Sequence, residues 1–157
     1  MNRTTRVAVF FATGFGLGWS PVASGTFGSL LGVGIVLLVW PTPWPLQALL
    51  ALATSLCAIP LCDAAERHFG KKDDPRIVAD EYLTFPICMI GLPLIPWVVG
   101  LAFVTNRVFD IIKPPPARGL QRLNGGLGIV ADDVFSSLYS LALNHGLYWL
   151  ISRWLGM

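Results

Sequence analysis

Residues 82–106, YLTFPICMIGLPLIPWVVGLAFVTN, form a charge-free stretch that is interrupted near its middle. A helix that spans a membrane needs about 20 consecutive apolar residues, so this stretch is long enough. However, Gly91-Leu-Pro-Leu-Ile-Pro96 introduces a glycine and two prolines, and proline breaks a helix by removing a backbone donor. The stretch is therefore either a kinked crossing or a hairpin that returns to the side it left.

The rest of the chain separates apolar and charged segments in the same way. The 157 residues are 54% hydrophobic and 13% charged, with a mean hydropathy of +0.64, whereas a soluble domain carries about 25% charged residues. Charges are also absent from residues 7–62 and 134–152. We therefore expect an all-α, multi-span integral membrane protein that forms a single domain over residues 1–157. The net charge of +2 gives no electrostatic footprint for nucleic acid.

Basic residues decide between the crossing and the hairpin, because Lys and Arg favour the cytoplasmic side of a membrane. Both segments that flank residues 82–106 are basic. The segment before contains Arg67, Lys71, Lys72 and Arg76, and the segment after contains Arg107, Lys113, Arg118 and Arg122. Both are expected inside, so the stretch is predicted to be a short hairpin broken by Pro and Gly.

Three full spans complete the predicted topology. We expect them over residues 27–40, 46–62 and 130–151, preceded by a short helix and a glycine-rich loop within residues 1–25. Pro41-Thr-Pro-Trp-Pro45 separates the first two spans, since three prolines cannot continue a helix. The predicted fold is thus about three full spans plus the hairpin, with the N-terminus inside.

This topology brings carboxylates from three segments to the cytoplasmic face. Asp80 and Glu81 begin the first arm of the hairpin, Asp110 ends the second arm, and Asp132 and Asp133 begin the last span. Acidic residues at a helix start commonly act as caps. Ionisable groups at the edge of the hydrocarbon are expensive and mark function by default, so three of them on one face favour a site.

Clustered carboxylates need a neutralising cation, and hard oxygen ligands select Mg²⁺. A second group of residues is suited to an anionic phospholipid. Ser24-Gly-Thr-Phe-Gly-Ser29 is predicted to open a helix, whose free N–H groups suit a phosphate, with close packing through small residues as the alternative. The expected substrate-binding residues are Lys113, Ser24, Thr26, Ser29, Arg107 and Arg122.

Five short motifs follow one another in a specific order and spacing. They are Gly14-Phe-Gly16 with Ser20-Pro21, Gly25-Thr-Phe-Gly-Ser29, Ile77-Val-Ala-Asp-Glu81, Arg107-Val-Phe-Asp-Ile-Ile-Lys-Pro114 and Gly125-Gly-Leu-Gly-Ile-Val-Ala-Asp-Asp133. Together they resemble the phosphatidylglycerophosphatase A family over residues 14–139. The resemblance implies a Mg²⁺-dependent enzyme of the bacterial inner membrane that hydrolyses phosphatidylglycerophosphate to phosphatidylglycerol and phosphate at the cytoplasmic face.

The resemblance also assigns roles to individual residues. Its catalytic set falls on Asp80, Glu81, Asp110, Lys113, Asp132 and Asp133. We expect Asp80, Glu81, Asp132 and Asp133 to hold Mg²⁺. Asp110 is expected to complete this set or to orient water, and Lys113 to pair with the phosphate. Metal-activated water is the expected nucleophile, with an aspartyl-phosphate as the alternative.

Two other functions remain open at the level of the sequence. A small membrane transporter or assembly protein would use interfacial carboxylates for protons or cations, although a transporter places its charges near the middle of the bilayer. Another Mg²⁺-dependent enzyme that acts on a lipid phosphate fits the same residues. The sequence does not indicate an oligomeric state.

Overall fold

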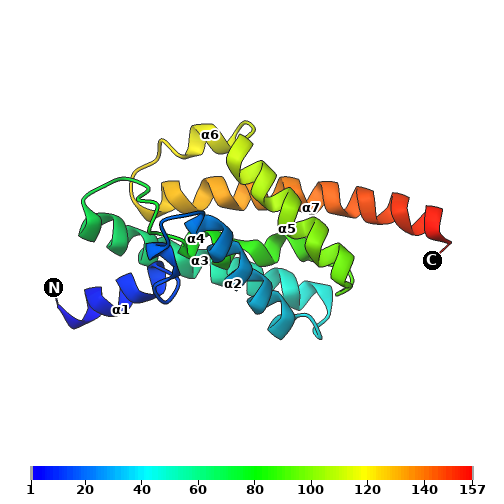
Figure 1. Cartoon of the computed structure of the whole chain (residues 1–157), viewed down its shortest axis with the longest axis horizontal. Helices are drawn as coiled ribbons and strands as arrows, with labels where there is room; N and C mark the ends of the chain where they lie inside the picture. The colour runs from blue at the N-terminus through cyan, green and yellow to red at the C-terminus, as the bar shows by residue number, and fades with distance from the viewer. Residues whose placement is uncertain (1, 157) are drawn as a thin grey trace.

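The computed structural model describes residues 2–156, which form helices and connecting loops without a β-strand (Figure 1). The all-α prediction is therefore confirmed. The elements are α1 (Arg3–Ala12), η1 (Leu17–Trp19), α2 (Ser24–Val39), α3 (Trp44–Phe69), α4 (Ala79–Thr84), η2 (Phe85–Met89), α5 (Pro96–Ile112), α6 (Ala117–Leu120) and α7 (Gly126–Leu155).

Within residues 2–156, two helices are long and apolar enough to cross a membrane: α3 with 26 residues and α7 with 30 residues. Two such helices are fewer than the three full spans predicted. The expected span 27–40 lies in α2, which is apolar but has only 16 residues, because the prolines from Pro41 onward end it. The expected spans 46–62 and 130–151 lie in α3 and α7, and each helix extends beyond both expected ends.

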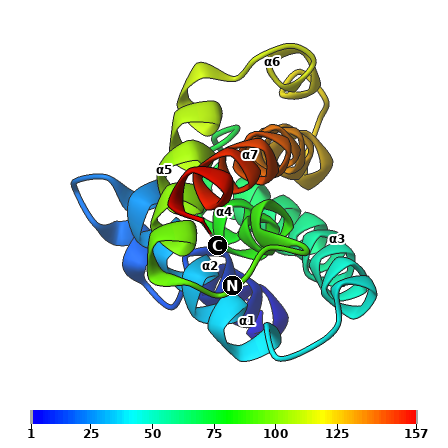
Figure 2. The same cartoon turned by 90° about the vertical axis from the view of Figure 1, so that its right-hand side faces the viewer.

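The predicted break in residues 82–106 is confirmed, since a loop over residues 90–95 separates η2 from α5. The first arm of the hairpin consists of α4 and η2, and α5 forms the second arm. Figure 2 shows α4 at the centre of the molecule, where it contacts α2, α3 and α7. Every residue of η2 is buried, so the first arm forms part of the protein core.

Buried polar side chains hold α5 against α7. Thr105 Oγ1 lies 2.6 Å from Ser140 Oγ and 2.9 Å from Asn144 Oδ1. The next residue of α5, Asn106, donates a hydrogen bond from Nδ2 to Ser137 Oγ at 2.9 Å, about one helical turn before Ser140 on α7. Buried polar groups are costly unless they are paired, so these contacts fix how α5 is aligned along α7.

Helix α2 approaches the first arm of the hairpin closely at Gly32. A Cβ atom on Gly32 would lie 2.4 Å from Cβ of Phe85 and 3.1 Å from the carbonyl oxygen of Tyr82. Because Cβ and backbone atoms cannot move independently of the chain, only glycine permits this contact.

The substitution Gly32→Ala should lower the free energy of unfolding by about 1–3 kcal/mol, because it overpacks the contact with Phe85. The matched control is Gly34→Ala in the same helix, where an added Cβ meets nothing within 4 Å. This control should be neutral or stabilising by up to about 1 kcal/mol, since alanine favours a helix. Thermal unfolding of the detergent-purified variants measures the difference, and equal melting temperatures would contradict the close packing.

Candidate active site

A polar cavity of about 610 Å³ lies where α2, α4, α5 and α7 meet. Residues from all four helices line it, together with the loops that precede α2 and α4. The lining includes Asp80, Glu81, Asp110, Lys113 and Asp133. Carboxylates from the three predicted segments therefore line one cavity.

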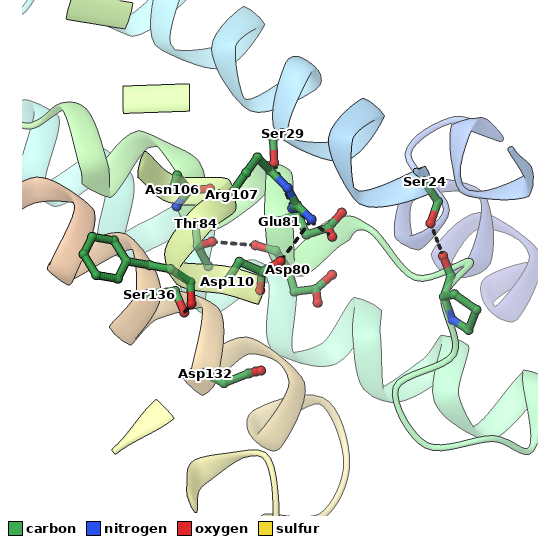
Figure 3. A network of polar contacts seen from close by, with 12 residues as sticks. Ser24, Ser29, Asp80, Glu81, Thr84, Asn106, Arg107, Asp110, Asp132 and Ser136 are labelled. Carbon is green, nitrogen blue, oxygen red and sulfur yellow. Dashed lines mark hydrogen bonds and ion pairs between the residues drawn. The ribbon is translucent and has the colours of Figure 1, made fainter. Parts of the chain in front are cut away.

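Arg107 connects α5 to both α2 and α4 at this cavity (Figure 3). Its Nη1 donates hydrogen bonds to Ser29 Oγ and Glu81 Oε1, each at 3.2 Å. Its Nη2 lies 3.1 Å from Asp110 Oδ2. One guanidinium thus compensates two carboxylates that are largely removed from solvent, and removing it would leave both uncompensated.

Lys113 and Asp132 form a second ion pair at the same site. Lys113 ends α5 in a left-handed conformation (φ +48°), and its ammonium contacts Asp132 Oδ2 on α7. Burial by itself lowers the pKa of Lys113, but the hydrogen bond and the charge of Asp132 outweigh burial and raise the pKa above its usual value. The lysine therefore remains charged, and Asp132 lies beside the cavity rather than in its lining.

Burial raises the pKa of both carboxyl groups on α4. Desolvation raises the pKa of Asp80 well above its usual value, and the neighbouring Glu81 adds charge repulsion. Desolvation also raises the pKa of Glu81 to about 8, although Arg107 opposes the shift. Such groups keep a proton near neutral pH unless a nearby cation favours the charged form.

Three carboxylate oxygens around the cavity are buried without a hydrogen-bond partner: Asp80 Oδ1, Glu81 Oε2 and Asp132 Oδ1. Buried polar atoms are normally paired, so each of these oxygens calls for a ligand or water. Among residues 2–156, no three His, Cys, Asp or Glu side chains are grouped closely enough to hold a metal ion as they stand. The donors therefore have the chemistry that Mg²⁺ prefers but do not form a closed ligand set.

Residues 10–148 match the family described as phosphatidylglycerophosphatase A. The chain belongs to this family. Phosphatidylglycerophosphatase A of Escherichia coli strain K12 is 34% identical over 145 residues, which cover 91% of this chain and 83% of the relative. The resemblance expected from the five motifs is confirmed, and the protein is a phosphatase.

Two further relatives cover nearly the same part of the chain. Phosphatidylglycerophosphatase A of Haemophilus influenzae is 33% identical over 148 residues, or 89% of this chain and 88% of the relative. A protein of Bacteroides thetaiotaomicron, provisionally named phosphatidylinositol-3-phosphatase, is 35% identical over 160 residues, or 96% and 99% of the two chains. No solved structure matches the chain significantly.

The predicted substrate-binding residues of this phosphatidylglycerophosphatase A family member do not all lie together. Ser24 begins α2 as expected and lines the cavity, where its hydroxyl donates to the carbonyl oxygen of Pro75 at 2.7 Å. Ser29 contacts Arg107. Thr26 is absent from the lining. Arg122 lines a neighbouring hollow of about 510 Å³, which shares Asp73 with the cavity and is also lined by Lys72, Arg118 and Gln121.

The cavity also contains residues that the sequence analysis did not select. Arg76 lines the cavity, and its Nε lies 2.7 Å from Asp74 Oδ1. Its guanidinium also stacks on the rings of Trp19 and Phe69. Its hydrogen bond lowers the pKa of Asp74. Asp73 lines the cavity as well. In the sequence, these residues form an ordinary charged loop, and no local pattern indicates that the loop folds over the site.

The site depends on the absence of a side chain at Gly25. A Cβ atom there would lie 2.1 Å from Glu81 Oε1 and 2.8 Å from Arg107 Nη2, which are the ends of flexible side chains. Gly25→Ala should therefore displace the charged groups without unfolding the protein, and lower phosphatase activity at least about tenfold. Phosphate release and melting temperature, each compared with Gly34→Ala, test this. Full activity in Gly25→Ala would show that the placement of Glu81 is unimportant.

The raised pKa of Glu81 predicts how stability depends on pH. Between its usual pKa of 4.5 and its folded pKa of about 8, the folded protein keeps a proton that the unfolded chain releases. The free energy of unfolding should therefore fall as pH rises through this range. Melting temperatures in chelator should decrease from about pH 5 to about pH 8, with a smaller decrease in Glu81→Gln. An equal decrease in the variant would contradict the shift.

Proposed function

We propose that this phosphatase removes the terminal phosphate of phosphatidylglycerophosphate to give phosphatidylglycerol, at the cytoplasmic face of a bacterial inner membrane. The observation that carries the proposal is the cavity in which carboxylates are combined with Arg107 and Lys113, in a chain of this family. Phosphoryl transfer needs charge neutralisation on the phosphoryl oxygens and a positioned attacking group. The cavity contains residues suited to both tasks.

Mg²⁺ is the proposed cofactor, held by Asp80, Glu81, Asp132 and Asp133. Unpartnered buried oxygens on the first three of these residues support it. All four donors are carboxylates, which Mg²⁺ prefers over nitrogen or sulfur ligands. When bound, the ion would supply charge neutralisation at the phosphate and lower the pKa of water.

The charged side chains of the chain itself would bind and orient the substrate. Lys113 remains protonated and would pair with the phosphate, exchanging part of its contact with Asp132 for the substrate. Asp110, held by Arg107 at 3.1 Å, would orient the attacking water. Ser24, at the start of α2, lines the cavity and would contact a hydroxyl of the headgroup.

The position of the basic segments supports a cytoplasmic orientation of the cavity. Segments 70–78 and 113–125 lie in the same half of the molecule as the N-terminus (Figure 1). The C-terminus and the loops over residues 40–43 and 90–95 lie in the other half. Lys and Arg are concentrated in the first half, which is the pattern expected for a cytoplasmic side.

The Bacteroides relative supports a second candidate substrate, phosphatidylinositol 3-phosphate. Both candidates present a phosphomonoester on a lipid headgroup, so the same carboxylates and Lys113 would serve either of them. They differ in the headgroup, which is a glycerol in one lipid and an inositol ring in the other. Assays with the two lipids in parallel therefore separate the candidates.

Phosphate release by detergent-purified protein tests the function directly. Wild-type protein should hydrolyse phosphatidylglycerophosphate with Mg²⁺ and stop in chelator, and Asp80→Asn should be at least about a hundredfold slower. The matched control is Glu66→Gln, because Glu66 also has a buried, unpartnered oxygen but does not line the cavity. This control should keep its activity.

Each component of the proposal fails on a different result. Activity that persists in chelator would remove Mg²⁺ from the mechanism. Hydrolysis of phosphatidylinositol 3-phosphate alone would replace the substrate. Equal activity in Asp80→Asn and Glu66→Gln would exclude the cavity as the site of chemistry.

A further inference from the structure

We propose that one acyl chain of the phospholipid substrate lies in an apolar groove between α2 and α5, about one helical turn along α5 from the active-site cavity. This inference rests on the proposed function, because it requires a lipid substrate. The groove has a volume of about 560 Å³. We call it the α2–α5 groove, and its lining includes Leu30, Val33 and Leu37 from α2 and Pro96, Gly100 and Phe103 from α5.

The groove and the cavity share one face of α5. Pro96, Gly100 and Phe103 line the groove, and Arg107 and Asp110 line the cavity. These positions are separated alternately by four and three residues, so they follow one stripe along the helix. Phe103 therefore lies about one helical turn, or about 6 Å along the axis, before Arg107.

Arg107 of the cavity contacts Ser29 of α2, the residue that precedes Leu30 of the groove. This contact, at 3.2 Å, joins α5 to α2 at the edge of the polar cavity. The next residue of α2, Leu30, already lines the groove. Along α5, the lining thus changes from charged at Arg107 to apolar at Phe103, as a phospholipid changes from headgroup to acyl chain.

The groove is accessible from outside the protein and contains no charged residue among those that line it. Leu30 and Leu37 are 51% and 54% exposed on its α2 side. On its α5 side, Gly100 leaves open space, because an added Cβ would meet nothing within 4 Å. An acyl chain fits this environment because burying each methylene group against apolar side chains is favourable.

A second apolar cavity, of about 390 Å³, lies between α3 and α7, and most of its α7 lining is turned away from Asp133. Its α7 lining includes Ala131, Phe135 and Leu138, which lie on the side of the helix away from Asp133. A chain bound there would be separated from the phosphate by α7. The α2–α5 groove is therefore the one of the two that can hold a chain of the reacting lipid.

The substitution Gly100→Leu should place a side chain in the groove without displacing the neighbouring helices, because an added Cβ meets nothing within 4 Å. Initial rates in mixed micelles are compared for phosphatidylglycerophosphate with long acyl chains and for a dihexanoyl analogue. The apparent KM for the long-chain lipid should rise about tenfold, which corresponds to about two displaced methylene groups, while kcat/KM for the short-chain analogue is unchanged. The matched control is Gly146→Leu on α7, another exposed glycine with open space around it, which should leave both values unchanged.

Several results would overturn the groove proposal. Equal losses on both substrates would show that Gly100→Leu disturbs the site itself. Unchanged kinetics on both would show that the groove holds no substrate chain, including the case in which a bulk membrane lipid occupies it. Equal effects of Gly100→Leu and Gly146→Leu would indicate a general surface effect.

A binding measurement separates the groove from the proposed function. Phosphatidylglycerophosphate with a diazirine at the end of one acyl chain is crosslinked to the wild-type protein, and the labelled peptides are identified by mass spectrometry. Labelling of residues 30–37 and 96–103 that Gly100→Leu abolishes supports the groove, even if no phosphate is released and the proposed function fails. Labelling confined to other segments overturns it.

Discussion

The interaction on which the rest of the site depends is the sharing of one guanidinium by two carboxylates. Arg107 contacts Glu81 on α4 and Asp110 on its own helix, and it also receives support from Ser29 on α2. Three elements that are distant in sequence are thereby joined at a point largely closed to solvent. Without this positive charge, the buried acidic groups would be uncompensated and α4 would lose its ion pair with α5.

Polar contacts between α5 and α7 also hold the helices of the site in place, at positions further from the cavity than Arg107. Thr105 and Asn106 bind partners on α7 and so fix the position of the two helices along each other. Asp110 and Lys113 follow on α5, where they reach the carboxylates near the start of α7. The cavity is thus formed at the ends of helices whose alignment is determined several residues away.

Local patterns explain what the sequence could predict. Proline and glycine mark the break at residues 91–96, and acidic residues next to apolar segments indicate the carboxylates that meet at the cavity. Family motifs identify the same residues independently. These signals depend only on residues that are neighbours in the sequence, so they can be recognised without a structure.

The remaining features depend on contacts between distant segments. Charge-free length alone suggested that residues 27–40 span a membrane, but α2 is limited to 16 residues by the prolines that follow it. Arg107 was expected to bind substrate, and its contacts with Glu81 and Asp110 become visible only once α4 and α5 are placed together. The stacking of Arg76 on Trp19 likewise joins segments more than fifty residues apart, so no local pattern could indicate it.

The central position of α4 and η2 has a consequence for the order in which the protein is assembled during synthesis. This segment is too short to cross a bilayer by itself and begins with two acidic residues, so it cannot insert as an independent unit. Two of the helices that bury it, α5 and α7, are synthesised after it. The segment therefore cannot complete its contacts until α5 and α7 have both been synthesised.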